Sequence, residues 1–188
     1  MSTVLRAQKQ SLLNQKAKMI WLFGLPSSGK STLAQSLEAR LFAEGFLTKI
    51  LDGDELRAGL NQGLGFTAEQ RTENLRRAAE VAKLFLETGV IVIAAFISPT
   101  EATRQLVQRI VGADDTCFVF VNASLKTCEA RDVKGLYAKA RRGEIQDFTG
   151  ISSPFELPQQ AVLEVRTDEL NVEQCTQFIY NNVSQFIR

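Results

Sequence analysis

The chain has 188 residues, and its composition of 45% hydrophobic and 23% charged residues argues against a disordered protein. Its net charge of +1 argues against a general nucleic-acid or membrane-surface binder. It contains no histidine, so a Ser-His-Asp triad, an HExxH zinc site and imidazole acid–base catalysis are excluded. Its three cysteines, Cys117, Cys128 and Cys175, form no CxxC pair, and such sparse usage predicts small buried thiols in a reducing compartment.

Strand-like and helix-like segments alternate along the first half of the chain. A polar extension over residues 1–18 precedes a short apolar run at 19–23, which is typical of a buried strand. A helix follows over 31–44, and a second strand is expected over 47–51. The segment 67–70 has the form of a capping box and begins a long helix that Gly89 ends.

The alternation continues to the end of the chain. Residues 90–97 are apolar throughout, as in a strand covered on both faces. Ser98 is expected to cap the next helix, with Pro99 at its first position. The remaining expected elements are strands over 117–121 and 161–165, a basic and mostly helical stretch over 124–142, and a last helix over 171–188.

This order of elements predicts an α/β fold with a five-stranded parallel sheet and helices on both faces. We expect a single domain over residues 19–188, preceded by the 1–18 extension. The stretch 143–158 lacks periodicity and carries two of the four prolines. We interpret it as part of a mobile lid over about 129–158.

No apolar run is long enough to cross a bilayer. The longest, 90–97, falls well short of the ~18–20 residues required. Lys16 and Lys18 before the run at 19–23 imitate a signal peptide, but that run is short and leads straight into a glycine-rich motif. We therefore expect a cytoplasmic protein with neither a membrane nor a nucleic acid as its partner.

Residues 24–31 match the phosphate-loop pattern GxxxxGK[ST] in full, between a strand and a helix. Its glycines let backbone N–H groups point at phosphate oxygens, and the helix N-terminus adds its positive dipole end. We expect Lys30 to reach the β- and γ-phosphates of ATP and Ser31 to ligate Mg²⁺. The alternative is a glycine turn beside a surface lysine. The predicted nucleotide-binding residues are Gly24, Pro26, Ser27, Ser28, Gly29, Lys30, Ser31 and Thr32.

Asp52 and Asp54 end the second strand, two residues apart. In an extended segment their side chains would share one face, and the carboxyl end of a parallel strand lies near the phosphate loop. Phosphoryl transfer needs a metal held by oxygen and an acceptor hydroxyl relieved of its proton. We predict that Asp54 orients that hydroxyl while Asp52, with Ser31, holds the metal. The alternative, an Asp-Gly turn with solvated carboxylates, stays open.

These residues resemble the adenylylsulfate kinase family. The resemblance runs in order from about residue 18 to the end, and its KGLY (134–137) and FTGI (148–151) blocks are far more specific than the phosphate loop. It implies a P-loop NTPase fold and, in a homodimer, transfer of the ATP γ-phosphoryl to the 3′-hydroxyl of adenylylsulfate, giving 3′-phosphoadenylylsulfate. The matching blocks are 24–32, 51–54, 64–66, 73–77, 96–99, 131–137, 143–145 and 148–150.

The resemblance also assigns roles position by position. Arg57, Arg71 and Asn74 match contacts to the phosphosulfate and ribose, and Phe66 and Phe148 match the rings that sandwich the acceptor adenine. Guanidinium groups suit fixed negative charge, and aromatic rings stack on purines. The other matches are Ile97 and Ser98 at the acceptor, Lys134 near its anionic end and Arg131 beside the ATP adenine. With Lys30, Asp52 and Asp54, Ser98 completes the candidate catalytic set.

Several of these residues also have structural interpretations. Phe66 and Phe148 are of a type that usually packs in a core, and Ser98 suits a helix N-cap. The basic stretch 131–142 predicts a local positive field near two anionic substrates. Its exposed members also fit a solvated helix face: Lys139, Arg141 and Arg142.

The chain departs from the family pattern at Thr100 and Glu101, where the family often has Tyr and Arg. This charge reversal leaves the phosphoryl machinery untouched but concerns the acceptor. We therefore keep a second hypothesis, the same phosphoryl transfer to another nucleotide-like anion. A third hypothesis, a nucleotide-binding module without activity, is disfavoured by the intact Lys30, Ser31 and Asp52.

Overall fold

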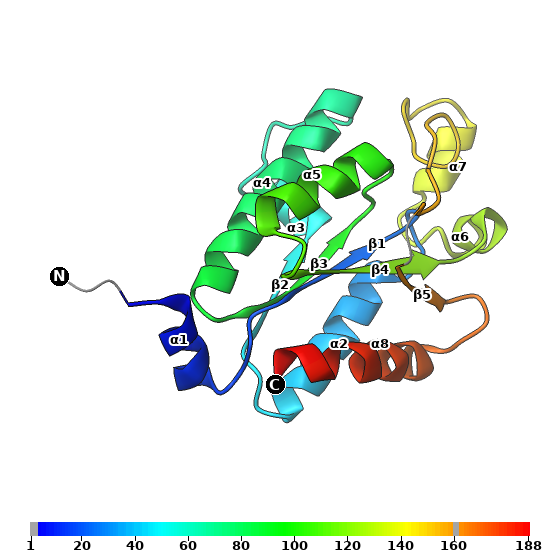
Figure 1. The fold of residues 1–188 in the computed structure, drawn as a ribbon. Coiled ribbons are helices and arrows are strands. Elements are labelled where there is room, and N and C mark those ends of the chain that lie inside the picture. Colours follow the sequence, from blue (N-terminus) through cyan, green and yellow to red (C-terminus); the bar gives the residue numbers. More distant parts are fainter. Residues whose placement is uncertain (1–3, 160–161) are drawn as a thin grey trace.

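The computed structural model describes residues 4–159 and 162–188, and over these ranges five parallel strands form one sheet in the order β2-β3-β1-β4-β5 (Figure 1). The parallel sheet confirms the predicted α/β architecture. Phe23, at the end of the central strand, is in register with Phe96 and Phe120 on its two neighbours, so the following loops share one edge. The strands are β1 (Met19–Phe23), β2 (Thr48–Asp52), β3 (Ile91–Phe96), β4 (Thr116–Asn122) and β5 (Leu163–Arg166).

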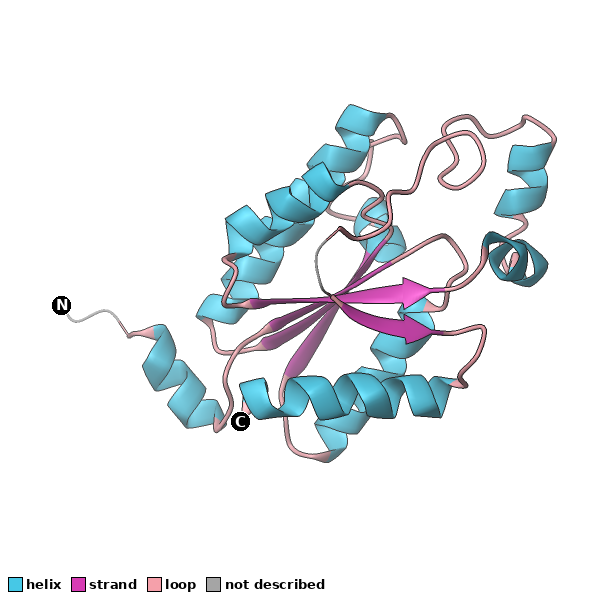
Figure 2. Cartoon of the chain, turned by 45° about the vertical axis from the view of Figure 1, so that its right-hand side comes forward, coloured by secondary structure: helices cyan, strands magenta, loops and turns pink. Residues whose placement is uncertain are grey.

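Helices cover both faces of the sheet, α4 and α5 on one and α2 and α8 on the other (Figures 1 and 2). Beyond the carboxyl edge of the sheet, α6 and α7 enclose a third, smaller apolar cluster. The helices are α1 (Arg6–Leu13), α2 (Lys30–Ala43), α3 (Gly53–Ala58), α4 (Ala68–Glu87), α5 (Glu101–Val111), α6 (Leu125–Arg131), α7 (Leu136–Arg141) and α8 (Val172–Ile187).

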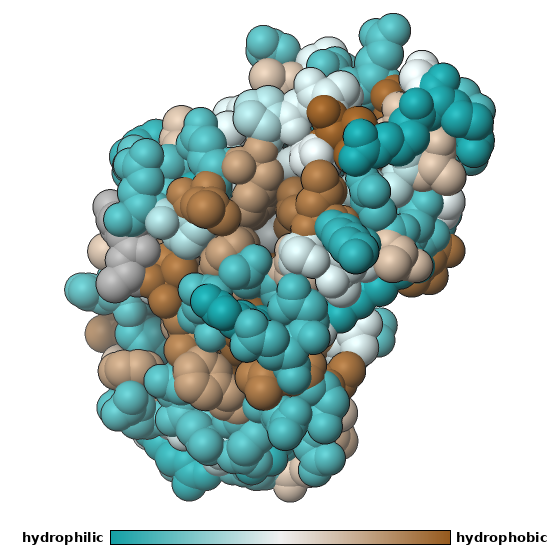
Figure 3. Space-filling model, turned by 90° about the vertical axis from the view of Figure 1, so that its right-hand side faces the viewer, coloured by the Kyte–Doolittle hydropathy of each residue, from teal (hydrophilic) through white to brown (hydrophobic). Residues whose placement is uncertain are grey.

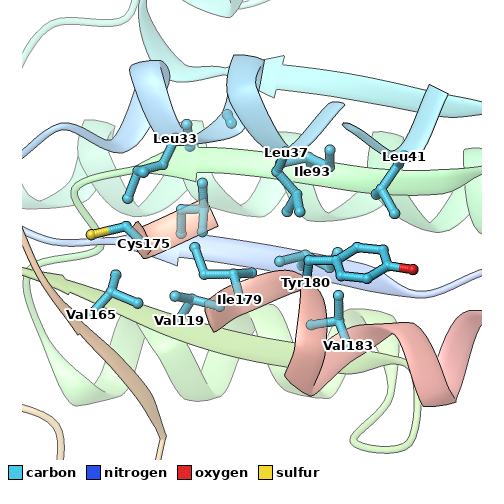
Figure 4. Close-up of a cluster of buried hydrophobic side chains, with 14 of the residues drawn as sticks. Leu33, Leu37, Leu41, Ile93, Val119, Val165, Cys175, Ile179, Tyr180 and Val183 are labelled. Carbon is cyan, nitrogen blue, oxygen red and sulfur yellow. The ribbon is translucent and has the colours of Figure 1, made fainter. Parts of the chain in front are cut away.

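The core follows from the apolar periodicity. Leu33, Leu37 and Leu41 recur every four residues along α2 and meet Ile179 and Val183 of α8 against the sheet (Figure 4). All five are at most 2% exposed. Burying a leucine- or valine-sized side chain contributes about 1.5–3 kcal/mol, so this interface holds α2 and the loop before it firmly to the sheet.

Most predicted strands and helices are found within one or two residues, but the starts of two helices differ in detail from the prediction. Thr67 caps α4, accepting from the backbone N–H of Gln70, but the reciprocal half of the capping box does not form. The prediction that Ser98 caps the next helix is wrong: Thr100 is the cap of α5. Ser98 instead adopts φ 44° and its buried hydroxyl accepts a hydrogen bond from the Trp21 indole.

The expected broad helical stretch after β4 is divided. Helix α6 ends at Arg131, and α7 begins only at Leu136 after a turn with Gly135 in the left-handed conformation. The three cysteines are unpaired, with Cys128 and Cys175 buried and Cys117 half-buried. Within the described ranges, no helix is both long and apolar enough to cross a membrane.

The N-terminal segment is joined to the opposite edge of the sheet from the phosphate loop. Arg6 of α1 forms an ion pair with Asp115, and Ala17 is buried. The Gln15 amide is 3% exposed and bonds to the backbone N–H and C=O of Leu47 and to the C=O of Gly89. One side chain therefore joins the chain segments that enter β1, β2 and β3.

We expect Gln15→Ala to lower the free energy of unfolding by about 2–4 kcal/mol, because the Leu47 N–H and the Gly89 C=O lose their partner, while the Leu47 C=O keeps its bond from the Ile91 N–H. Urea denaturation monitored by circular dichroism measures this value. The matched control, Gln185→Ala at an exposed position of α8, should change it by less than about 0.5 kcal/mol. Equal values for the two variants would contradict this role of Gln15.

Candidate active site

The phosphate loop, residues 24–31, connects β1 to α2 at the carboxyl edge of the sheet. A Cβ atom on Gly24 would lie 2.3 Å from the carbonyl oxygen of Val121, so no larger residue fits where the loop leaves the strand. Gly29 has φ 100° and is the N-cap of α2, and Ser27 also has positive φ. These left-handed residues curl the backbone as the motif predicts.

The ammonium group of Lys30 is buried inside this loop. It donates to the carbonyl oxygens of Leu25 (2.6 Å) and Gly24 (3.1 Å), with the Ser28 hydroxyl 3.4 Å away. Over the described residues it forms no ion pair with a carboxylate. Burial lowers the pKa of Lys30 to about 8. The lysine is therefore a desolvated cation that a phosphate group would stabilise, which excludes the surface-lysine alternative.

Ser31 and Asp52 lie together as predicted. The Ser31 hydroxyl donates to a carboxylate oxygen of Asp52 at 2.6 Å. The expected extended segment from Asp52 to Asp54 is wrong, because the chain turns at Gly53 into helix α3. Asp52 is the cap of that helix and accepts from the backbone N–H of Asp54. Asp54 is thereby in the first helical turn, and its exposed carboxylate pairs with Lys134 at 2.5 Å.

The Ser31–Asp52 pair fits a magnesium ion. Its donors are hard oxygens, which Mg²⁺ prefers, and Mg²⁺ usually takes only one or two protein ligands, with water and substrate phosphates completing the shell. Across the described ranges no cluster of three or more His, Cys, Asp or Glu side chains could hold a metal on its own. The arrangement thus suits a metal that arrives with a nucleotide.

On the acceptor side, two guanidinium groups contact one aromatic ring. Arg57 and Arg71 lie 4.5 and 5.6 Å from the centroid of Phe66, which is 56% exposed. Burial lowers the pKa of both arginines, and the charge of Arg57 lowers the pKa of Arg71 further. In the part of the chain that the structure describes, neither forms an ion pair. An anion bound between them would relieve this repulsion.

Arg71 also joins this cluster to the predicted lid. It donates to the backbone oxygens of Phe66 and Asp147 and to the Thr149 hydroxyl. Phe148, between the last two, is only 7% exposed and packs edge-on against Tyr137. The structure therefore brings the two predicted stacking residues to one region, with Phe66 open to solvent and Phe148 buried.

The remaining predicted acceptor residues lie at the ends of β3 and in α4. Asn74 is buried and accepts a hydrogen bond from Asn61, a turn residue that no sequence pattern marks as part of the site. Ile97 is half-buried, and its carbonyl oxygen accepts from Gly24 of the phosphate loop. Ser98 is 1% exposed, so its hydroxyl faces the Trp21 indole rather than solvent.

Arg131 lies against the other side of the phosphate loop. It donates to Thr167 through two bonds, and the Thr167 hydroxyl donates to the carbonyl oxygen of Ser28. Thr167 is a second contact that the sequence did not reveal. In the loop itself Pro26 and Ser27 are half-buried, and Thr32 is exposed on α2.

The positive field expected over 131–142 is weaker than its composition indicates. Arg141 pairs with Glu129, and Arg142 pairs with Glu144. These pairs are exposed surface contacts, as expected for a solvated helix face. Lys134, whose pKa is raised mainly by its hydrogen bond with Asp54, is the cation of this stretch that faces the carboxylates.

A cavity of about 550 Å³ lies beneath the segment 150–157, beside the phosphate loop. In the face that carries α6 and α7, apolar side chains gather over this region (Figure 3). The lining includes Leu25 of the loop but neither Lys30 nor the two aspartates. Its residues are Leu25, Phe120, Val121, Asn122, Ala123, Leu125, Gly150, Ile151, Ser152, Ser153, Pro154, Phe155 and Leu157.

Glu101, the residue that departs from the family pattern, is neutralised locally. Its carboxylate accepts two hydrogen bonds from Arg104, which is 3% exposed and lies over the ring of Phe23. Arg104 also donates to the carbonyl oxygen of Ser98. The negative charge is therefore committed to an internal pair.

Comparison with known proteins gives consistent results. The family model for adenylylsulphate kinase matches residues 16–166. Adenylyl-sulfate kinases of Phocaeicola vulgatus and Bacteroides fragilis are 54% and 55% identical over 169 residues, which cover 90% of this chain and 83% and 84% of theirs. The solved APS kinase from Mycobacterium tuberculosis, in complex with AMPPNP and APS, has a TM-score of 0.86 at 41% identity, covering 90% of this chain and 98% of its own.

We expect the affinity of the chain for ADP to fall about tenfold between pH 7 and pH 9. The lowered pKa of about 8 means that Lys30 loses its proton over this interval, and only the charged form attracts phosphate. Isothermal calorimetry at several pH values, without metal, measures the effect. Lys30→Ala should bind more weakly at pH 7 and lack this step. A pH-independent affinity in the unaltered protein would contradict the assignment.

Proposed function

We propose that this chain, which belongs to the adenylylsulfate kinase family, transfers the γ-phosphoryl group of ATP to the 3′-hydroxyl of adenylylsulfate. The products are ADP and 3′-phosphoadenylylsulfate. One observation carries the proposal: the short helix α3 lies between the phosphate loop and the Arg57–Phe66–Arg71 cluster. Its cap, Asp52, accepts a hydrogen bond from Ser31 at the end of the loop, and the helix contains Asp54 and Arg57. An anionic donor and an anionic, aromatic acceptor would thus face the same carboxylates.

At the donor end, the loop would bind the ATP phosphates through backbone N–H groups and the Lys30 ammonium. Ser31 and Asp52 would hold Mg²⁺, which neutralises phosphate charge when bound. Lys30 would exchange its carbonyl partners for phosphate oxygens and keep its proton, because the new negative charge offsets the cost of its burial. Arg131, fixed by Thr167, would lie beside the ATP adenine.

At the reacting atoms, Asp54 would accept a hydrogen bond from the 3′-hydroxyl and take its proton as the oxygen attacks the γ-phosphorus. The bond between that phosphorus and the bridging oxygen breaks, and ADP leaves. Lys134, which now pairs with Asp54, would turn to the phosphoryl group or the acceptor anion. This exposed pair is weak enough to exchange partners.

At the acceptor end, Arg57 and Arg71 would bind the phosphosulfate, with Asn74 as a neutral donor. The Asn61 amide already occupies the Asn74 carbonyl oxygen, so the Asn74 NH₂ group remains to donate. Phe66 and Phe148 would stack on the adenine, and Ile97 and Ser98 would border it.

A closing lid over about 129–158 completes the proposal. Closure would exclude water and suppress ATP hydrolysis. The cavity beneath 150–157 leaves space for this segment to move, and Phe148 must shift to stack on a ligand.

We further propose that the protein acts as a homodimer in the cytoplasm. Light scattering after size exclusion tests the assembly.

Phosphoryl transfer to a different nucleotide-like anion remains the second hypothesis. Glu101 motivated it, but the Glu101–Arg104 pair removes the free negative charge on which it depended. The retained Phe66, Arg71 and Asn74 favour adenylylsulfate.

The decisive assay is ADP release from Mg²⁺-ATP with and without adenylylsulfate, with mass identification of the product. We expect acceptor-dependent release and formation of 3′-phosphoadenylylsulfate. Other nucleotide-like anions serve as competing acceptors. Faster turnover of one of them would support the second hypothesis, and ATP binding with no turnover would support a non-enzymatic module.

We expect Asp54→Asn to reduce kcat about 10²–10⁴-fold, because the amide cannot take the hydroxyl proton. ADP affinity should change little, since Asp54 lies outside the phosphate loop. The control Glu55→Gln removes a neighbouring exposed carboxylate of α3 and should retain full activity. Full activity in the Asp54 variant would refute its role.

A further inference from the structure

Tyr137 of α7 lies between the two halves of the site. Its side chain is 2% exposed, and its hydroxyl donates to the carbonyl oxygen of Pro26 in the phosphate loop at 3.0 Å. Its ring packs edge-on against Phe148, with 4.9 Å between the centroids. One rigid side chain therefore contacts both the nucleotide loop and a predicted acceptor ring.

The backbone of Tyr137 is fixed at the same time. One carboxylate oxygen of Asp132 accepts from the Tyr137 N–H at 2.9 Å, and the other accepts from the Ala138 N–H at 3.0 Å. Gly135 supplies the left-handed turn before the helix. These bonds hold the first turn of α7 to Asp132, the C-cap of α6, so the backbone of Tyr137 is fixed relative to the end of α6.

The contact also sets the orientation of one peptide group in the phosphate loop. The carbonyl groups of Gly24 and Leu25 accept from Lys30, whereas that of Pro26 accepts from Tyr137. In a trans peptide the N–H group points opposite to the carbonyl. Tyr137 thus holds the Ser27 N–H directed away from α7, in the loop whose N–H groups bind phosphate.

We propose that Tyr137 is a positioning residue that couples occupancy of the phosphate loop to the position of Phe148. The coupling acts through the hydroxyl on one side and the ring on the other, and it is reciprocal. The acceptor half rests on the proposed function, because only there does Phe148 contact a substrate. The mechanical half, from the loop to the segment 148–153, depends only on the contacts described above.

That segment offers a direct readout. The backbone N–H of Gly150 donates to Ser153, and those of Ile151, Ser152 and Ser153 donate to the carbonyl oxygen of Phe148. Amide hydrogen exchange reports how often such bonds open. None of these residues belongs to the predicted nucleotide set, but the segment lines the same cavity as Leu25 of the phosphate loop. The comparison with Tyr137→Phe therefore identifies the tyrosine as the route of any effect of ADP on the segment.

The experiment compares hydrogen exchange in this segment with and without ADP for three proteins: the unaltered chain, Tyr137→Phe and Tyr180→Phe. Tyr137→Phe removes the hydroxyl and keeps the ring against Phe148. Tyr180 is the matched control, since it is the other tyrosine of the chain, is 9% exposed, and donates its hydroxyl to Glu44 on the far side of the sheet.

We expect ADP to slow exchange in the segment about fivefold in the unaltered protein and in Tyr180→Phe, and to have no effect in Tyr137→Phe. ADP affinity should also fall about fivefold in Tyr137→Phe alone. Equal slowing in all three proteins, or none in the unaltered protein, would overturn the proposal. A merely structural tyrosine would lower the melting temperature without abolishing the ADP response.

The acceptor half is read from the affinity for adenylylsulfate with and without ADP. We expect the ratio of the two dissociation constants to move towards one in Tyr137→Phe, and an unchanged ratio would overturn that half. If the unaltered protein neither binds nor phosphorylates adenylylsulfate, the proposed function fails, while the exchange experiment still decides the mechanical coupling.

Discussion

The buried ammonium group of Lys30 is the constraint on which the rest of this structure depends. Within residues 4–159 and 162–188 it is held by neutral oxygens of its own loop and by no carboxylate, and burial lowers its pKa to about 8. Keeping a charged lysine there requires the curled loop, which needs Gly24 against Val121 and Gly29 at the start of α2. The leucine stripe of α2 in turn fixes that helix to the sheet. The packing of the core thus keeps the Lys30 ammonium group inside the phosphate loop, where a phosphate group could bind to it.

The acceptor side follows the same principle with guanidinium groups. Arg57 and Arg71 contact one ring, lack anionic partners over the described residues, and have lowered pKa values. Arg104 shows the contrast, since it is buried but paired with Glu101. Arg104, which supports the fold, is therefore neutralised by a carboxylate, whereas Arg57 and Arg71, which would bind the substrate, are not. This distinction explains why the departure at Glu101 need not alter acceptor choice.

Features that depend on interactions between residues close in sequence could be predicted, and features that depend on contacts between distant segments could not. The strands, α2 and the phosphate loop were predictable because apolar periodicity and GxxxxGKS are local patterns. Helix α3 was missed because Asp52 could end a strand or cap a helix, and only the tertiary structure decides. The local sequence favours Ser98 as a helix cap, but its hydroxyl accepts a hydrogen bond from the indole of Trp21, which is distant in sequence. The contacts of Tyr137 with Pro26 and of Thr167 with Ser28 join segments far apart in sequence, and no spacing predicts them.

The most direct test of the whole account is a crystal structure of the chain with ADP, Mg²⁺ and adenylylsulfate. We expect the β-phosphate to lie inside the 24–31 loop, with Lys30 moved from the Leu25 carbonyl to a phosphate oxygen. We also expect the acceptor adenine to lie between Phe66 and Phe148, with the 3′-hydroxyl of the acceptor ribose at Asp54. An acceptor bound away from the Arg57–Phe66–Arg71 cluster, or Lys30 unmoved beside bound ADP, would contradict it.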